Sequence, residues 1–364
     1  MNKSTFGNRI SVSTWGESHG PALGVVVDGI PAGLELSAED IQKMLDRRKP
    51  GQSKFTTARA EGDEVEILSG VMNGVTTGCP ISMMVRNKDQ HSKDYGNIAT
   101  TFRPGHADYT FYEKYGIRDF RGGGRSSGRE TIGRVAAGAI ASKILESLGI
   151  KILTYAKEIG PVKISKVNPS DITKNALNMP DMDAAIEAEK FLAQCIKNQD
   201  SAGGIIECVI SGVKPGLGDP VFGKMDAALA GAMLSIGAVK GFEIGDGFEA
   251  AKALGSQNND EFATDENGNV YKKTNHSGGT LGGITDGSDI VFRVAIKPTP
   301  SISQTQHTVN EAGEEVELVI NGRHDPIIVP RAVVVVEAMA ALTVLDALML
   351  HMTDRIDYLK DFYG

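Results

Sequence analysis

Two sets of residues recur in the same order along the chain, and this repeat limits the folds that the sequence can adopt. The spacing of Gly70, Gly74, Val75, Thr76, Gly78 and Ile81 matches that of Gly279, Gly283, Ile284, Thr285, Gly287 and Ile290. A shorter echo relates residues 29–34 to residues 212–217. Because both echoes keep their order, the sequence predicts a single domain made of two related halves, about residues 1–150 and 151–364, packed around a pseudo-twofold axis.

The periodicity of apolar residues predicts that each half holds a sheet and long helices, with the helices pairing centrally. Strand-like runs occur at residues 10–14, 24–27, 65–68, 81–85, 152–155, 205–210 and 290–296. Helices are expected to begin at Ser37 and Ser127, where Asp40 and Glu130 complete sequences typical of capping boxes. Further helices are expected over residues 183–198, 222–236 and 332–350.

The charge balance argues against binding to nucleic acids or membrane surfaces. The chain has 38 Lys and Arg against 46 Asp and Glu, a net charge of −8, whereas such partners demand a broad excess of cations. Cys79, Cys195 and Cys208 lack C-x-x-C spacing, so neither a disulfide framework nor a metal site is expected. We interpret them as reduced core cysteines.

Two further features bear on localisation and mobility. The first nine residues contain no apolar run, so no signal peptide is predicted and a cytoplasmic protein is expected. The apolar stretch 332–350 carries Glu337 and Asp346, which favours a buried helix over a membrane span. Residues 256–275 are polar and nearly free of aliphatic side chains, so we expect a mobile insertion there.

An otherwise acidic chain concentrates six arginines between Arg103 and Arg134. They lie in R-P-G-H-A-D at Arg103 and R-G-G-G-R-S-S-G-R-E at Arg121, just before an expected helix. Guanidinium groups, serine hydroxyls and the free N–H groups of a helix start are donors that phosphates and carboxylates need. The segment therefore predicts a multiply anionic small-molecule ligand. An Arg/Gly-rich RNA-binding loop is the alternative, but aromatic residues are sparse there.

His19, His106 and His324 all lie in turns rich in glycine or arginine, which favours a shared role in proton transfer. A lone histidine of this kind is as often structural. The turn 321–326 precedes the last helix as residues 125–130 precede the second, so the duplication predicts that both turns face one pocket. Alternatively, Arg323 and Asp325 simply pair with each other and cap the helix.

A second glycine-rich segment, residues 275–283, leads into a strand that ends at residues 297–301. Its paired glycines would let backbone amides approach a ring or a phosphate, although a plain hairpin is the alternative. No G-x-G-x-x-G opens a βαβ unit with an acidic residue downstream, so a Rossmann nicotinamide site is not supported.

Seven motifs, taken in order, resemble the motif set of the chorismate synthases. They are G-E-S-H-G at Gly16, D-R-R-x-P-G at Asp46, R-P-G-H-A-D at Arg103, R-G-G-G-R-S-S at Arg121, G-D-G-F at Gly245, K-P-T-P-S at Lys297 and R-H-D-P at Arg323. The resemblance covers roughly residues 5–355, and seven ordered motifs make coincidence implausible. It implies an α+β fold, a β-α-β sandwich with long antiparallel helices between two antiparallel sheets, and a homotetramer of single-domain subunits.

The resemblance also implies an activity. Members of that family are lyases that remove phosphate from 5-enolpyruvylshikimate 3-phosphate by 1,4-anti elimination, giving chorismate in the last step of the shikimate pathway to aromatic amino acids. Reduced FMN would be the cofactor, with NADPH or an external flavin reductase as the source of electrons. A hydrolase that releases phosphate with His and Arg but without flavin is the competing enzyme hypothesis.

Residue roles follow from the same resemblance. His19, beside Ser18, would protonate or stabilise the leaving phosphate, His106 would protonate reduced flavin, and Asp325 would assist deprotonation at the flavin N5. The substrate's anionic groups would be bound by Arg48, Arg103, Arg129, Arg323 and Lys54, of which Arg48 and Lys54 are candidate NADP contacts. The FMN site would be lined by Arg125, Ser126, Ser127, Gly237, Ala238, Gly282, Lys297, Pro298, Thr299, Pro300, Ser301 and Arg323.

Two positions depart from the family pattern. Lys54 stands where many relatives carry arginine, so the charge is kept but the bidentate fork is lost. Gly128 replaces a common alanine at the start of the second helix, a change that we expect to be tolerated.

Overall fold

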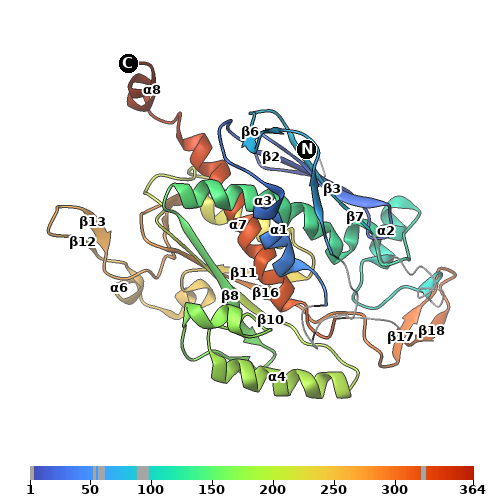
Figure 1. The fold of residues 1–364 in the computed structure, drawn as a ribbon. Coiled ribbons are helices and arrows are strands. Elements are labelled where there is room, and N and C mark those ends of the chain that lie inside the picture. The colour runs from blue at the N-terminus through green and yellow to red at the C-terminus, as the bar shows by residue number, and fades with distance from the viewer. Residues whose placement is uncertain (1–3, 52–54, 56–61, 88–97, 321–324) are drawn as a thin grey trace.

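The computed structural model describes residues 4–51, 55, 62–87, 98–320 and 325–364 (Figure 1). Two antiparallel sheets of five strands each make up its framework. The first sheet has the order β1 (Thr5–Phe6), β2 (Ser11–Gly16), β3 (Ala22–Asp28), β7 (Ile81–Arg86) and β4 (Val65–Ile67). The second has the order β11 (Val239–Ile244), β16 (Ile290–Ile296), β10 (Gly204–Ser211), β8 (Lys151–Ile159) and β9 (Val162–Lys163).

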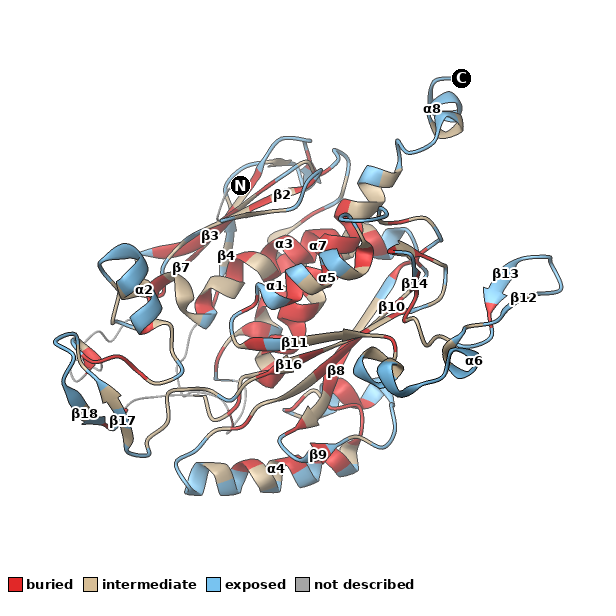
Figure 2. Ribbon diagram, turned by 180° about the vertical axis from the view of Figure 1, so that it is seen from behind, coloured by how far each residue is buried: buried red, intermediate tan, exposed pale blue. Residues whose placement is uncertain are grey.

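Four helices form the apolar centre, namely α1 (Ala38–Arg48), α3 (Thr131–Ser147), α5 (Met225–Leu234) and α7 (Val329–His351). Helix α3 packs against β2, β3 and β7, whereas α7 packs against β8 and β10, and α3 and α7 pack against each other. Figure 2 shows the buried residues gathered on these helices and on the sheet faces beside them. This arrangement confirms an α+β protein with antiparallel sheets.

The apolar helix predicted over 332–350 is α7, the one described helix long and apolar enough to cross a membrane. In its most apolar window 72% of the residues are buried inside the protein. The charge of Asp346 can be buried within this helix because its carboxylate accepts hydrogen bonds from the backbone N–H groups of Asn8, Arg9 and Ile10. The helix is therefore part of the core, as the sequence predicted.

Matching hairpins come just before β7 of the first sheet and just before β16 of the second sheet. In the hairpin of β5 (Val71–Met72) and β6 (Val75–Thr76), Thr76 Oγ1 donates to Pro31 O at 2.8 Å and accepts from Leu34 N at 3.0 Å. In the hairpin of β14 (Thr280–Leu281) and β15 (Ile284–Thr285), Thr285 Oγ1 donates to Lys214 O at 2.8 Å and accepts from Leu217 N at 2.9 Å. The residues that echo each other in sequence thus make the same contacts.

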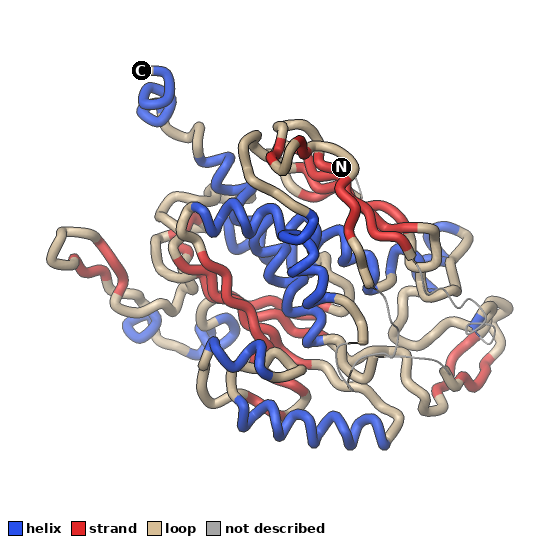
Figure 3. The backbone as a smooth tube through the Cα atoms, viewed as in Figure 1, coloured by secondary structure: helices blue, strands red, loops and turns tan. Residues whose placement is uncertain are grey.

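The remaining described elements lie around this framework. They are α2 (Asp108–Tyr115), η2 (Gly124–Ser126), η3 (Gly128–Glu130), η4 (Pro169–Lys174), α4 (Met182–Lys197), η5 (Gly247–Lys252), α6 (Gly255–Asn258), β12 (Phe262–Thr264), β13 (Val270–Lys272), β17 (Gln306–Val309), β18 (Glu315–Leu318) and α8 (Ile356–Tyr363). In the tube view of Figure 3, the short C-terminal helix α8 projects away from the body.

Most predicted elements are confirmed, and three details differ. The capping box at Ser37 and Asp40 is present, but Ser127 caps η3, and Glu130 instead accepts hydrogen bonds from Thr14 and Arg134. Strand β11 was missed because its residues lack clear alternation. Cys79 is exposed, so only Cys208 fits the expectation of a fully buried core cysteine.

The polar segment 256–275 contains the hairpin of β12 and β13, which projects from the body in Figure 1. Its base is fixed by Lys272, whose buried ammonium group lies 3.1 Å from Asp260 and 2.7 Å from Asp286. Such a buried ion cluster orders the root of the hairpin. The mobility of its tip stays a prediction.

Helices α3 and α7 cross where Gly138 meets Ala338, and no side chain fits between them. A Cβ atom added at Gly138 would lie 2.3 Å from Ala338 Cβ and 2.5 Å from its Cα. We expect Gly138→Ala to lower the free energy of unfolding by roughly 1–3 kcal/mol, because overpacking forces the two backbones apart.

The matched control is Gly231→Ala in α5, where a Cβ would meet nothing within 4 Å. That change should be neutral or stabilise the protein by up to about 1 kcal/mol, since alanine is the better helix former. Urea unfolding measures the free energy of unfolding of both variants. Equal stability of Gly138→Ala and Gly231→Ala would contradict close packing of the two helices at Gly138.

Candidate active site

One large cavity lies where the ends of the four central helices meet, and both halves of the chain line it. The C-terminal ends of α1 and α5 contribute Arg48 and Ser235, and the N-terminal ends of α3 and α7 contribute Thr131 and Ala332. Its volume is about 1680 Å³, above the ~300–1,000 Å³ that is typical of a site for one small molecule. The cavity can therefore hold two ligands side by side.

All six arginines between Arg103 and Arg134 line this cavity. They are Arg103, Arg118, Arg121, Arg125, Arg129 and Arg134. Lys240, Lys297 and Arg331 add further cations from the second half of the chain. In a protein with a net charge of −8, such a local concentration of cations attracts and binds polyanions.

Arg48 and Arg129, which both line the cavity, contact the same buried carboxylate behind its wall. Asp63 Oδ2 lies 2.5 Å from Arg48 NH2, and Asp63 Oδ1 lies 3.3 Å from Arg129 NH1. The side chains of Arg48 and Asp63 are 1% and 0% exposed. Arg129 also donates to Asn87 Oδ1 at 2.8 Å. Two guanidinium groups of the cavity lining therefore face one buried carboxylate.

His106 belongs to a second buried cluster, which the turn before α2 builds. Asp108, the first residue of α2, accepts from Arg103 Nε and Arg103 NH2, both at 2.7 Å, and lies 2.9 Å from His106 Nδ1. Burial raises the pKa of the Asp108 carboxyl, but its hydrogen bonds to Arg103 and His106 outweigh this effect and hold that pKa well below its usual range. His106 and Arg103 therefore line the cavity in a fixed arrangement.

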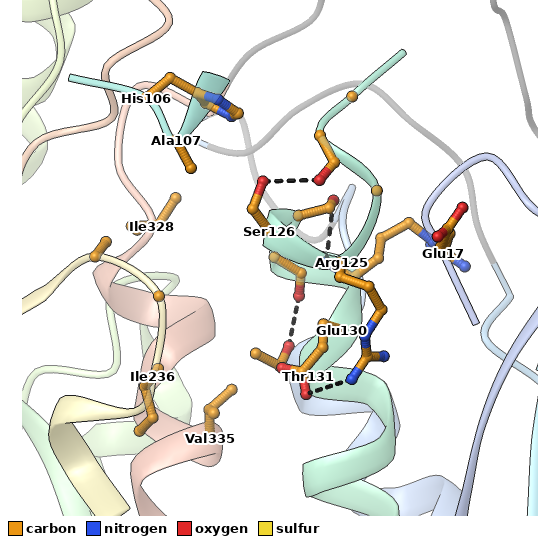
Figure 4. Close-up of a pocket in the computed structure, with 18 of the residues that line it drawn as sticks. Glu17, His106, Ala107, Arg125, Ser126, Glu130, Thr131, Ile236, Ile328 and Val335 are labelled. Atoms are coloured by element: carbon orange, nitrogen blue, oxygen red, sulfur yellow. Dashed lines mark hydrogen bonds and ion pairs between the residues drawn. The ribbon is translucent and has the colours of Figure 1, made fainter. Parts of the chain in front are cut away.

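The serine and arginine residues before α3 lie on the opposite side of the cavity from α7, as Figure 4 shows. Arg125 donates to Thr14 Oγ1 at 2.7 Å and to Gly16 O at 3.2 Å, which ties the turn to β2. Ser126 donates to Gly123 O at 2.7 Å, and Ser127 caps η3. These predicted cofactor residues all line the cavity.

Arg134 connects this turn to the second half of the chain. It donates to Glu130 Oε2 at 2.9 Å and to Ser235 Oγ at 2.6 Å. Ser235 precedes Gly237 and Ala238, two predicted cofactor residues that also line the cavity. Ala238 has a φ of 71°, so its backbone takes a left-handed turn at the cavity wall.

His19 and Ser18 lie just behind the cavity wall and are not among the described residues that line it. A Cβ atom at Gly122 would lie only 2.6 Å from His19 Cε1, so His19 packs directly against this lining glycine. Ser18 Oγ lies 3.4 Å from His19 Nδ1.

The other predicted residues divide into three groups. Lys297, Thr299, Pro300, Ser301 and Asp325 line the cavity, whereas Pro298 and Gly282 are not among its described lining residues. Gly282 lies in the exposed turn between β14 and β15, so the structure does not bring it to this site. Lys54, Arg323 and His324 lie outside the described residues.

Several lining residues were not predicted from the sequence. Arg331, on the first turn of α7, donates to Asp325 Oδ2 at 2.5 Å and to Arg48 O at 3.1 Å. Ile236, Ile328, Ala332, Val335 and Met339 form an apolar wall. A sequence uniformly rich in valine and alanine does not distinguish the cavity face of α7 from its core faces. The predicted alternative of an Asp325–Arg323 pair stays a prediction, because Arg323 lies outside the described residues.

Comparisons with known proteins agree with the motifs. The model of the family described as chorismate synthase matches residues 10–349. A chorismate synthase of Agathobacter rectalis is 67% identical, with 100% of this chain and 99% of the relative covered, and one of Lachnoclostridium phytofermentans is 62% identical over 100% of both chains. A solved structure entitled "Crystal Structure of Chorismate Synthase" superposes with a TM-score of 0.77 at 33% identity, covering 98% of this chain and 97% of the other.

Proposed function

The chain belongs to the chorismate synthase family, and from this premise we propose that its cavity is where reduced FMN and 5-enolpyruvylshikimate 3-phosphate meet. The protein is a carbon–oxygen lyase that catalyses the 1,4-anti elimination of phosphate from this substrate, the last step of the shikimate pathway. The convergence of six arginines and His106 on one cavity carries the proposal. Two ligands, one of them multiply anionic, match its size and charge.

The described residues fit a bound flavin. The apolar wall of α7 and Ile236 offers a flat contact for a ring system, while Arg125, Ser126 and Lys297 offer donors for a phosphate. The buried Oγ1 atom of Thr299 has no hydrogen-bond partner within the described part of the chain, although Thr299 lines the cavity. When bound, reduced flavin would supply the electron-rich ring that makes loss of phosphate possible. Chorismate synthases are known to use reduced flavin, and the identity of the cofactor as FMN belongs to this proposal.

The substrate would be held by the cationic wall. Arg48 and Arg129, which share Asp63, would bind its phosphate and carboxylate groups, with Arg103 nearby. Because these guanidinium groups are buried and already oriented, little side-chain entropy is lost on binding. The roles of Arg323 and Lys54 in the same task remain part of the proposal by family resemblance.

Proton transfer would fall to groups at the edges of the cavity. His106 would protonate the reduced cofactor, and Asp325, held beside Arg331, would act as a carboxylate base near the flavin N5. His19, which packs against the lining residue Gly122 and has Ser18 beside it, would act on the leaving phosphate. General acid–base groups of this kind must come within hydrogen-bond reach of the reacting atoms, and apo geometries are often looser.

An anaerobic assay with purified protein tests the proposed function. With substrate and reduced FMN, chorismate and phosphate should form in equal amounts. With oxidised FMN or without flavin, neither should form. A flavin-independent hydrolase would instead release phosphate without chorismate, and chorismate formation in the absence of any flavin would overturn the proposal.

The family resemblance also implies an oligomeric state and a source of electrons for the flavin. We propose a cytoplasmic homotetramer whose FMN is reduced either by NADPH bound near Arg48 and Lys54 or by an external flavin reductase. Arg48 is 1% exposed, so a nicotinamide nucleotide would reach it only from inside the cavity. The two routes are distinguished by incubating the protein and its substrate with oxidised FMN and an excess of NADPH, without a reductase. Chorismate should form only if the protein itself uses NADPH to reduce FMN.

We also infer that the two halves arose by duplication within a single domain and pack as a β-α-β sandwich. The order β2, β3, β7, β4 in the first sheet corresponds to β8, β10, β16, β11 in the second. The matching hydrogen bonds of Thr76 and Thr285 support this correspondence. On this view, the cavity lies on the pseudo-twofold axis, because equivalent helix ends from each half line it.

A further inference from the structure

Asp108 is a buried carboxylate that touches the cavity only through its neighbours. It is 3% exposed, and no cavity-lining atom belongs to it among the described residues. Its Oδ2 accepts from Arg103 N at 3.1 Å and from Arg103 Nε at 2.7 Å. Its Oδ1 accepts from Arg103 NH2 at 2.7 Å and lies 2.9 Å from His106 Nδ1. One carboxylate therefore holds both an anion-binding arginine and the histidine of the site.

We propose that Asp108 is a positioning residue that fixes the proton of neutral His106 on Nδ1, so that Nε2 is the atom that exchanges protons in the cavity. The proposal rests on the function proposed above, in which His106 carries a proton. It assigns Asp108 no direct contact with substrate or cofactor.

The surroundings of the imidazole decide which ring nitrogen is protonated. Nδ1 lies between Asp108 Oδ1, at 2.9 Å, and Arg103 NH2, at 3.1 Å. An ionised carboxylate only accepts hydrogen bonds and a guanidinium only donates them, so Nδ1 can satisfy only one of the two. Arg103 NH2 already donates to Asp108, and the pKa of Asp108 is held low by its hydrogen bonds. The carboxylate therefore keeps the proton on Nδ1.

The other edge of the ring faces the cavity wall. A Cβ atom at Gly123 would lie 3.1 Å from His106 Cε1 and 3.4 Å from Nε2, and Gly123 lines the cavity. Gly123 has a φ of 87°, a conformation that also favours glycine. Nε2 is thus the ring nitrogen beside the ligand space, and no described residue donates a hydrogen bond to it, so its lone pair can accept a proton and return it.

The charges around His106 explain why a carboxylate is needed. Arg103 lies against the ring, Arg118 NH1 lies 3.9 Å from Asp108 Oδ2, and Lys297 donates to Gly105 O in the same turn. Glu311 faces Arg118 from the far side at 3.3 Å. Without Asp108, the nearby guanidinium groups would oppose a second proton on the ring, because like charges destabilise each other at short range. Asp108 offsets them.

The direct test is to determine the tautomer of His106. The ¹⁵N chemical shifts of the ring nitrogens are measured in holoenzyme with labelled histidine, at a pH high enough to keep the imidazole neutral. The signal of His106 is the one that disappears in His106→Gln. The wild type should show the proton on Nδ1. In Asp108→Asn, Arg103 should donate to Nδ1 and the proton should move to Nε2. If the wild-type protein carries this proton on Nε2, the proposal is wrong. This result needs no activity measurement and does not depend on whether Asp108→Asn folds.

Turnover gives the second readout. Asp108→Asn should lower kcat roughly 10- to 100-fold, the usual effect of removing a partner that orients a functional histidine, with a smaller change in KM. The acid limb of its pH profile should shift to lower pH, since the imidazolium loses its counter-charge. The matched control is Asp181→Asn, a buried carboxylate that caps α4. It should leave tautomer and pH profile unchanged, and an unchanged profile in Asp108→Asn as well would contradict the proposal.

Discussion

His106→Ala is expected to lower the turnover number by roughly 10²- to 10⁴-fold, the usual contribution of a positioned acid–base group. His106 lines the cavity, and the contacts that hold the anion-binding Arg48 and Arg129 to Asp63 do not involve it. The variant should therefore bind substrate and flavin almost as tightly as the wild type. Anaerobic steady-state kinetics with reduced FMN, together with flavin titrations, measure both effects.

The matched control for this experiment is His307→Ala. His307 lies on β17, its side chain is 85% exposed, and it is not among the described cavity residues. Its removal should leave kcat unchanged. Near-normal turnover of His106→Ala would make the histidine structural and would remove it from the proposed proton transfer.

Asp63→Asn is expected to lower the free energy of unfolding by roughly 3–5 kcal/mol, because it removes the charge from the carboxylate that faces the buried Arg48 at 2.5 Å and Arg129 at 3.3 Å. Asparagine keeps the shape of the side chain and tolerates the φ of 46° at this position, so the change isolates the charge. Urea unfolding monitored by circular dichroism measures the loss.

A second measurement on the same variant connects stability to binding. In Asp63→Asn, a bound phosphate group can replace the missing carboxylate, so saturating substrate should raise the midpoint temperature of unfolding more than it does in the wild type. The control is Asp46→Asn, which removes a carboxylate that is 47% exposed and paired with Lys49. That variant should lose no more than about 1 kcal/mol. If Asp63→Asn and Asp46→Asn lower the free energy of unfolding equally, the contacts of Asp63 with Arg48 and Arg129 do not stabilise the protein as proposed.

The strands and central helices could be predicted because their sequences carry strong local signals. The alternation at β2, β3, β7, β10 and β16 predicted those strands, and the capping box at Ser37 set the start of α1. The arginine-rich turn could be assigned to a ligand site because its residues are contiguous and lead directly into α3. In these segments, residues that are neighbours in the sequence both form the element and supply its functional groups, so the sequence alone indicates them.

Features that depend on distant contacts could not be predicted. Asp63 gave no signal of its own, since its importance comes from Arg48 and Arg129, which are brought to it by folding. The position of His19 behind Gly122 depends on how two turns pack. Likewise, the glycine-rich motif around Gly282 resembled a ligand loop in sequence, but it forms a hairpin turn away from the cavity.

A crystal structure of the protein with FMN and substrate bound would show whether one cavity between the helix ends receives both ligands. We expect the isoalloxazine ring against Ile328 and Val335, with the substrate phosphate within hydrogen-bond distance of Arg48 or Arg129. Flavin density elsewhere, for example at the turn that holds Gly282, or a substrate bound away from the arginine wall would contradict it.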